Sequence, residues 1–259
     1  MPRLAANLSM LFADLPFIER FQAAAKAGFT GVEYLHPYGE RADDIAAELE
    51  AHGLTQVLFN FPPGDWEAGD RGIAGLPERS GEFRDGVGLA IEYAATTGCR
   101  RLHAMAGLAR DGGTPADYLD TYATNIQFAA DAAAEHGIDI MVEAINSRVD
   151  MPGYIVDTVD KVLSVLDVVD RPNVYVQYDI YHMQIMHGDL ARSLDALLPR
   201  IGHVQLADNP GRHEPGTGEI NYDWLLAYID AAGYEGWVGC EYRPAGETTA
   251  GLGWAAAWL

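Results

Sequence analysis

The sequence predicts an α/β protein built as a single (β/α)₈ barrel over residues 1–259. Three observations lead to this prediction. Apolar runs alternate with helical segments eight times along the chain, which is typical of a barrel of parallel strands. The apolar runs are nearly continuous, as expected of strands that are buried on both faces. No serine- or glycine-rich linker divides the chain into two parts.

Glycines mark the ends of the expected helices, because glycine readily takes the left-handed backbone that closes a helix. Asp14 is predicted to cap the first helix. In the N-terminal half we expect strands at residues 4–10, 31–35, 55–61 and 101–106, and helices at 15–27, 42–52, 78–97 and 117–136. In the C-terminal half we expect strands at 138–143, 174–179, 202–205 and 237–241, and helices at 157–169, 190–198, 222–232 and 252–259, with a short helical piece after residue 182.

A doubly wound open sheet is the alternative architecture. It would be favoured by a glycine-rich phosphate loop after the first strand, but residues 7–14 contain no glycine. The third strand is followed by a long loop at about residues 62–77. Loops of this length in a compact domain often cover a site, so we expect this one to be an active-site loop.

The chain is strongly acidic, with a formal charge of −21 and only two lysines, Lys26 and Lys161. Such a surface repels nucleic-acid phosphates and anionic membranes. No run approaches the roughly 18 apolar residues of a membrane span, and the N-terminal segment has no long apolar stretch of a signal peptide. Two distant cysteines, Cys99 and Cys240, do not suggest disulfides. We therefore expect a cytoplasmic protein with a small-molecule substrate and no nucleic-acid or membrane partner.

Four oxygen-bearing residues lie at or near the ends of the last four expected strands. They are Glu143, Asp179, Gln205 and Glu241, separated by 36, 26 and 36 residues, about one strand–helix unit each. Strand ends of a parallel barrel meet on one rim, where active sites lie. Three crowded carboxylates would repel one another without a cation. Oxygen ligands without cysteine favour Mg²⁺ or Mn²⁺, so the sequence predicts a metal site.

Other polar residues fall on the same predicted rim and are candidates for substrate binding. Each also has a plain structural interpretation as a helix cap or a solvated loop residue. The candidates are His182, Arg212, Asn60, Asn146 and Arg148. His103 and His203 lie earlier in their strands, so we expect them in the interior of the barrel.

Several stretches resemble the hydroxypyruvate isomerase family of the xylose isomerase-like barrels. The resemblance covers almost the whole chain and is most specific in the segment GHVQLADNPGRHEPGTGEINY at residues 202–222. Further matching stretches are GDWEAGDRG at 64–72, EAIN at 143–146, QYDIYHMQ at 177–184 and GYEGWVGCEYRP at 233–244. The sequence departs from the family at Ala144, where we expect proline, and at residues 103–105.

The resemblance implies a TIM barrel, a divalent metal and an aldose–ketose-type isomerisation. It implies that Glu143 and Glu241 form the acid/base pair and that they hold the metal together with Asp179 and Gln205. The expected reaction converts hydroxypyruvate to tartronate semialdehyde through a cis-enediolate, with the carbonyl and the neighbouring hydroxyl on the metal. Which glutamate acts first stays open.

Four alternatives stay open at this point. A 2-oxo-tetronate isomerase is a neighbouring activity in the same family. A ketose 3-epimerase uses a similar metal and glutamate pair, but usually with histidine where this chain has Gln205. A metal-dependent endonuclease would need a basic face, and a non-catalytic sugar-acid binding barrel would not need both glutamates. The aromatic tail residues Trp254 and Trp258 pack either on the barrel or on another subunit of a homo-oligomer.

Overall fold

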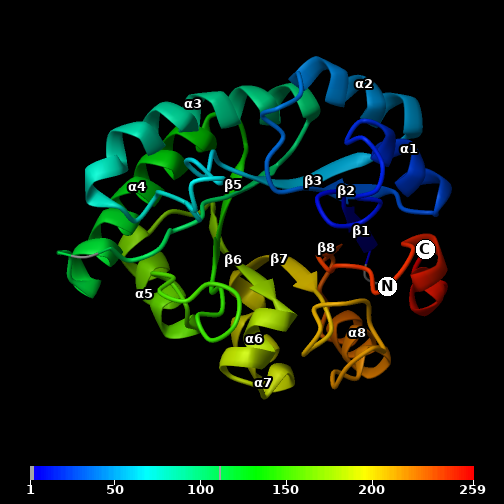
Figure 1. Ribbon diagram of the computed structural model, residues 1–259. Coiled ribbons are helices and arrows are strands. Elements are labelled where there is room, and N and C mark those ends of the chain that lie inside the picture. The colour runs from blue at the N-terminus through cyan, green and yellow to red at the C-terminus, as the bar shows by residue number, and fades with distance from the viewer. Residues whose placement is uncertain (1–2, 111) are drawn as a thin grey trace.

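The apolar strands of this chain are buried on both faces because they close on themselves. In the computed structural model, which describes residues 3–110 and 112–259, the strands form a closed barrel in the order β1 to β8 (Figure 1). Every neighbouring pair is parallel, including β1 with β8. The predicted (β/α)₈ barrel is therefore confirmed, and the open sheet is excluded.

The elements follow the predicted order. The strands are β1 (Arg3–Asn7), β2 (Gly31–Glu33), β3 (Thr55–Asn60), β4 (Arg101–His103), β5 (Asp139–Glu143), β6 (Val174–Asp179), β7 (Ile201–Leu206) and β8 (Trp237–Cys240). The α-helices are α1 (Glu19–Lys26), α2 (Ala42–His52), α3 (Ser80–Thr97), α4 (Pro115–Ala134), α5 (Val159–Val169), α6 (Ile180–Met186), α7 (Leu190–Leu197) and α8 (Tyr222–Ala231). Short 3₁₀ segments are η1 (Pro77–Arg79), η2 (Leu198–Arg200) and η3 (Thr249–Ala255).

Local signals in the sequence set several helix ends. Thr114 and Asp117 form a reciprocal capping box at the start of α4, which satisfies N–H groups that the first turn leaves free. Gly53 ends α2 with φ 63°, a left-handed backbone that glycine adopts without steric cost. Asp179 closes β6 and also caps α6 through its side chain. The change from strand to helix at Asp179 therefore fixes the direction of this carboxylate.

The first helix begins later than predicted, and Asp14 does not cap it. Turns occupy the segment before α1, which starts at Glu19 with Ile18 in the capping position. The guanidinium of Arg20 donates hydrogen bonds to three backbone carbonyls of this segment, including those of Leu8 and Leu15. These carbonyls accept from a side chain instead of from helical N–H groups, which accounts for the shorter helix.

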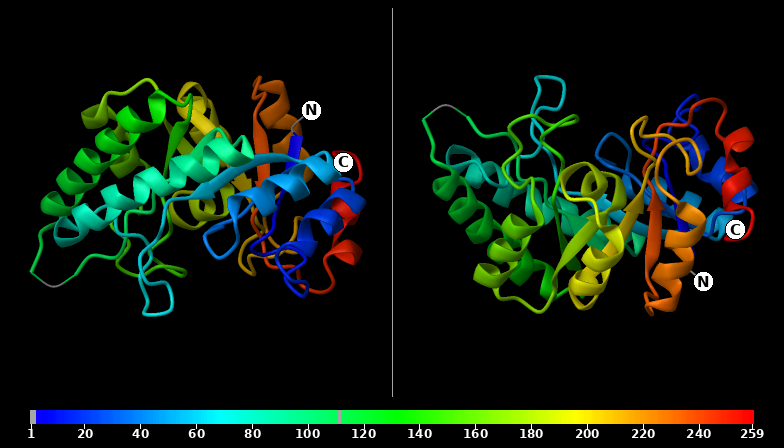
Figure 2. Two further views of the ribbon diagram at one scale, coloured as in Figure 1. Left: turned by 90° about the horizontal axis from the view of Figure 1, so that it is seen from above. Right: turned by 90° about the horizontal axis from the view of Figure 1, so that it is seen from below.

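The C-terminal tail packs on its own barrel. Its predicted helix is a 3₁₀ segment, η3, which lies beside α1 in Figures 1 and 2. Trp254 and Trp258 are partly buried against the hydrophobic core, and the Trp254 ring is 6.3 Å from that of Tyr242. These two tryptophans therefore pack on the barrel of their own chain. The homo-oligomer stays a prediction, and these tryptophans give it no support. Within the two described ranges, no helix is both long enough and apolar enough to cross a membrane.

A buried glutamate occupies the interior of the barrel below its carboxyl end. Glu33 ends β2, is fully buried, and pairs in register with Asn7 of β1. Its carboxylate accepts hydrogen bonds from Asn7 Nδ2 (3.0 Å) and Gln205 Nε2 (2.8 Å) and lies 2.7 Å from His203 Nε2. The prediction that His203 is an interior residue is confirmed. Gly239 on β8 leaves the space that the Glu33 carboxylate fills.

Substituting Gly239 with alanine tests this packing. The added Cβ would lie 2.3 Å from both carboxylate oxygens of Glu33, and overpacking of an interior costs about 1–3 kcal/mol. We expect the free energy of unfolding of Gly239→Ala, measured by urea denaturation, to fall by that amount. Gly246→Ala is the control, because its Cβ would meet no atom within 4 Å. Equal stability of the two variants would contradict the account.

Candidate active site

Glu143 is a buried carboxylate with an unused oxygen. It ends β5 and is 4% exposed. Its Oε1 has no hydrogen-bond partner among the described residues, and its Oε2 lies 3.5 Å from Nε2 of His103. Burial raises the pKa of Glu143 well above its ordinary value, and the charges of Asp179 and Glu241 raise it further. Burial lowers the pKa of His103 to about 3, so this imidazole is neutral and does not offset the charge.

Asp179 presents a second unused oxygen toward the same space. Its Oδ1 accepts from the backbone N–H of Tyr181 at 2.8 Å, as the cap of α6. Its Oδ2 is buried and has no hydrogen-bond partner in the described part of the chain. Burial raises the pKa of Asp179, although Arg212 and the backbone N–H groups of α6 act in the opposite direction. A cation or a proton would stabilise these two unsatisfied carboxylate oxygens, which lie at neighbouring strand ends.

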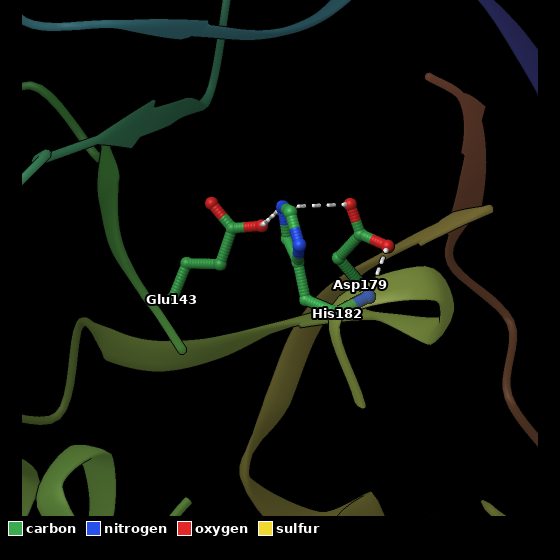
Figure 3. A group of neighbouring side chains, drawn as sticks. All are labelled: Glu143, Asp179 and His182. Carbon is green, nitrogen blue, oxygen red and sulfur yellow. Dashed lines mark hydrogen bonds and ion pairs between the residues drawn. The ribbon is translucent and has the colours of Figure 1, made fainter. Parts of the chain in front are cut away.

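His182 stands between these two carboxylates (Figure 3). Its Nε2 lies 3.6 Å from Asp179 Oδ2 and 3.8 Å from Glu143 Oε1. Glu143, Asp179 and His182 each offer one potential ligand atom, and these three atoms lie within 4.8 Å of one another. The structure therefore contains a carboxylate and histidine cluster with the composition of a metal site.

The hydrogen bonds of Asn146 assign the protonation of His182. Asn146 Oδ1 accepts from the backbone N–H groups of Val149 (2.9 Å) and Asp150 (3.0 Å), which fixes the orientation of the amide. Its Nδ2 then faces His182 Nδ1 at 2.7 Å and donates to it. Burial lowers the pKa of His182 well below its ordinary value. The neutral ring therefore carries its proton on Nε2, where it serves as a donor rather than a metal ligand.

Gln205 is held by three side chains. Its Nε2 donates to Glu33 Oε1 (2.8 Å) and to Glu241 Oε2 (2.5 Å), and its Oε1 accepts from Gln177 Nε2 (2.6 Å). The amide is buried at the end of the β6–β7 pairing, directly opposite Asp179. Its carbonyl oxygen keeps one lone pair beyond the bond from Gln177, which leaves it able to ligate a metal.

Glu241 follows β8 rather than ending it and is bound to an arginine. Arg212 Nη2 lies 2.8 Å from Glu241 Oε1, and Arg212 Nη1 lies 3.2 Å from Asp150 Oδ1. Burial raises the pKa of Glu241, while the charge of Arg212 lowers it in part. Although burial alone lowers the pKa of Arg212, the surrounding carboxylates raise it overall, so the guanidinium stays charged.

A cavity of about 280 Å³ is lined by Glu143, His182 and Glu241, whereas Asp179 and Gln205 are not among its lining residues. Its polar wall is formed by Asn60, Trp66, Arg71, His103, Glu143, Asp150, Gln177, His182, Arg212, Glu241 and Arg243. Glu143 and Glu241 thus border one space from strands β5 and β8. Asn60, His182 and Arg212 also line it, so their roles as substrate contacts stay predictions, and the buried His103 reaches it as well.

Two predicted substrate contacts lie elsewhere. Asn146 is fully buried behind His182 and acts through that ring. Arg148 is exposed, and its Nη1 donates to the carbonyl of Ile185 in α6 at 2.7 Å. Arg148 does not line the cavity, because the loop after β5 turns its side chain outward, and the structure gives the predicted substrate contact no support.

Sequence reasoning missed three residues of the site region. Glu33 carried a usable signal, since it is a charged residue inside the apolar run predicted as a strand at residues 31–35. Asp150 bridges Asn146 and Arg212 through its two carboxylate oxygens. Arg71 lines the cavity from the long loop. Loop residues such as these have no periodic pattern that would place them.

The long loop, residues 62–77, is tied down over the cavity and projects from the same end of the barrel as the loop after β7 (Figure 2). Gly72 forms an antiparallel bridge with Ala106, where a Cβ would lie 2.3 Å from the carbonyl of Met105. Asp70 accepts hydrogen bonds from Arg79 (2.5 Å) and Arg110 (2.9 Å). The loop is thus anchored to η1 and to the segment after β4.

The donor set fits a divalent cation. Glu143 and Asp179 each have a buried oxygen without a partner, and Glu241 adds a third carboxylate to the same region. A cation would offset the repulsion between these groups and occupy the oxygens that no hydrogen bond satisfies. Carboxylate and amide oxygens are ligands of hard divalent ions.

Comparisons with known proteins agree with the barrel fold. A family model described as a xylose isomerase-like TIM barrel matches residues 21–259. A protein of Cupriavidus necator named 2-oxo-tetronate isomerase is 49% identical over 259 residues, which is 100% of this chain and 99% of that protein. A protein of Escherichia coli named hydroxypyruvate isomerase is 44% identical over 254 residues, which is 98% of each.

A solved structure is also closely similar. The crystal structure of a Brucella melitensis protein, described as an AP endonuclease of family 2, superimposes with a TM-score of 0.97. It is 50% identical and covers 100% of this chain and 99% of that chain.

The pH dependence of stability tests the anchoring of the long loop. Burial raises the pKa of Asp70, but hydrogen bonds from Arg79 and the Asp65 N–H, with the arginine charges, lower it overall. A carboxyl with a depressed pKa stabilises the fold above its unfolded pKa of about 4, and this contribution is lost as the pH falls through the folded value. We expect Asp70→Asn to lower the free energy of unfolding by about 1 kcal/mol at pH 7.

The difference between wild type and Asp70→Asn should shrink as the pH falls below about 4. Urea denaturation at pH 7 and at a pH below about 4 measures this difference in the free energy of unfolding. The exposed Asp85, for which no side-chain contact is found in the described ranges, supplies the control Asp85→Asn. A difference that does not depend on pH would show that the Asp70 charge does not anchor the loop.

Proposed function

The chain belongs to the xylose isomerase-like TIM barrel family, and on this premise we propose that it is a metal-assisted isomerase of a short 2-oxo acid. The substrate class carries a carboxylate at C1, a carbonyl at C2 and a hydroxyl at C3. The full-length relatives described above support this class through their names. The more similar of those two makes a four-carbon 2-oxo-tetronate the first candidate, with hydroxypyruvate as the three-carbon candidate.

The observation that carries the proposal is a pair of buried glutamates on one cavity. Glu143 and Glu241 line it from strands β5 and β8. Burial raises the pKa of each carboxyl, and a carboxyl with a raised pKa accepts a proton from carbon more readily. Two such groups on one cavity suit an exchange of a proton between adjacent carbons.

In the proposed reaction the C3 proton passes to one ionised glutamate, which gives a cis-enediolate. The O3 proton passes to O2, and the other glutamate, which is protonated, gives its proton to C2, so that the carbonyl moves from C2 to C3. Proton exchange with solvent then restores both glutamates. The Nε2–H of His182 and the guanidinium of Arg212 orient substrate oxygens. The loop at residues 62–77 limits the access of water to the cavity.

Glu143, Asp179, Gln205 and Glu241 are the residues proposed to hold the cation, with Mg²⁺ or Mn²⁺ as the favoured ions. When bound, such an ion polarises the substrate carbonyl and stabilises negative charge on the neighbouring oxygens. Two features of the chain support this assignment. The unsatisfied oxygens belong to Glu143 and Asp179, and Arg212 keeps Glu241 in place at the other side of the group.

The remaining alternatives are less well supported. The name of the Brucella melitensis structure points to a nuclease, but a formal charge of −21 opposes binding to phosphate backbones. A ketose 3-epimerase is disfavoured by Gln205 where such enzymes usually have histidine. A small-molecule substrate, a cytoplasmic location and the absence of nucleic-acid and membrane partners stay part of the proposal.

Removal of metal tests the cofactor assignment. Protein stripped with a chelator should lose nearly all isomerisation of 2-oxo-tetronate and hydroxypyruvate, and Mg²⁺ or Mn²⁺ should restore it. The measurement is the formation of the isomerised product, tartronate semialdehyde in the three-carbon case. Full activity in metal-free protein would overturn the assignment.

Removal of one glutamate tests the proton transfer. Glu143→Gln and Glu241→Gln should each reduce kcat by about 10²- to 10⁴-fold, the usual contribution of a general base. Exchange of solvent deuterium into the substrate, followed by NMR, should fall in parallel. Glu235→Gln, in the exposed segment before β8, is the control and should leave both unchanged. A loss of less than about tenfold in kcat would exclude the assigned role.

A further inference from the structure

Three arginines line the cavity, and an acidic substrate needs one whose charge is not already neutralised. They are Arg71, Arg212 and Arg243. The cavity also contains the carboxylates of Glu143, Asp150 and Glu241. A substrate carboxylate entering this space meets repulsion from those groups, so that its recognition requires a positively charged donor with free N–H groups.

Arg212 meets this requirement only in part. It makes ion pairs with Glu241 (2.8 Å) and Asp150 (3.2 Å) through its two terminal nitrogens. Its guanidinium also packs 5.1 Å from the ring centroid of Tyr181. The positive charge of Arg212 is therefore shared between two resident carboxylates, although its buried Nε has no hydrogen-bond partner among the described residues.

Arg71 meets the requirement. Its Nη1 donates to the backbone carbonyls of Trp66 (3.2 Å) and Asp70 (2.7 Å), and its guanidinium lies 4.2 Å from the Trp66 ring centroid. Across the described residues it has no ion pair, and its Nε and Nη2 have no hydrogen-bond partner. The nearest acid in sequence, Asp70, is taken by Arg79 and Arg110. Arg71 is thus held in place while two donors stay free.

The support behind Arg71 is itself fixed. Trp66 packs against His36 with ring centroids 5.1 Å apart. The loop that carries both Trp66 and Arg71 is anchored at Asp70 and at the Gly72–Ala106 bridge. A donor that is ordered before binding loses less conformational freedom when the ligand arrives.

We propose that Arg71 binds the carboxylate of the substrate through Nε and Nη2 and thereby selects short 2-oxo acids over neutral sugars. The side and terminal nitrogens of a guanidinium match the two oxygens of a carboxylate. The inference rests on the proposed function, since it names the group that recognises its substrate class. It assigns to the long loop a role in specificity as well as in covering the cavity.

Arg243 provides a matched comparison. It lines the same cavity and has the same charge, but its side chain is exposed and makes no contact found in the described part of the chain. Ordering such a side chain costs rotamer entropy when the ligand binds. Arg243 therefore contributes only a diffuse charge, whereas Arg71 offers a fixed pair of donors.

Steady-state kinetics of Arg71→Gln and Arg243→Gln test the inference on whichever acid the wild type isomerises. Loss of a charged hydrogen-bond pair corresponds to about 10- to 100-fold in affinity. We expect Arg71→Gln to raise KM by that factor with kcat within about threefold, because the carboxylate is bound equally before and during proton transfer. Arg71→Lys should recover part of the loss, and Arg243→Gln should change KM less than threefold.

Circular dichroism confirms that the variants fold. An unchanged KM in folded Arg71→Gln, or an equal increase in Arg243→Gln, would overturn the inference while the proposed function stands. If the wild type isomerises no short 2-oxo acid, calorimetric binding of D-glycerate tests the carboxylate site separately from the proposed function. In that case the proposed function fails, and at least tenfold weaker glycerate binding in Arg71→Gln would still support the carboxylate site. Wild-type protein that does not bind glycerate at all would overturn both.

Discussion

Repulsion among buried carboxylates at the carboxyl end of the barrel is the constraint on which the rest of the site depends. Glu33, Glu143, Asp179 and Glu241 are each less than 8% exposed, and charges taken from water into an interior of low polarity interact strongly. Each carboxylate is supported in a different way. Glu33 has side-chain donors, Asp179 has the N–H groups of α6, and Glu241 has an arginine. Glu143 has the least support of the four.

This uneven support gives the site its chemistry. Glu143 has the fewest partners, and burial and the neighbouring carboxylates raise its pKa. The Nε2–H of His182 lies between Glu143 and the unsatisfied oxygen of Asp179. The opposite wall is set by Arg212, which pairs with Glu241 and Asp150. A cation is best accommodated where the support is weakest, and a substrate oxyanion is best accommodated where free donors remain.

The sequence predicted the parts of this arrangement that follow from periodicity. Apolar runs and glycine stops identified eight strands, and the strand ends placed Glu143, Asp179, Gln205 and Glu241 on one rim, as the closed barrel has them. It did not predict which way side chains turn after a strand ends. Arg148 points outward for this reason. The metal and catalytic roles of the four rim residues stay predictions.

Tertiary contacts decided the features that local patterns could not. The segment before α1 forms turns because Arg20 binds its carbonyls, although its local sequence favours a helix. Glu33 was overlooked because the strand predicted at residues 31–35 places it in the middle, whereas β2 ends at Glu33. The orientation of the Gln205 amide depends on side chains from β2, from β6 and from the residue that follows β8.

A diffraction experiment on crystals loaded with Mn²⁺ tests the central claim, that the barrel gathers its buried carboxylates to hold a divalent cation. The anomalous signal of manganese locates the ion without reference to activity. We predict one strong anomalous peak bounded by Glu143, Asp179, Gln205 and Glu241. A map with no peak there at saturating Mn²⁺, or with the strong peak at another place on the protein, would contradict the claim.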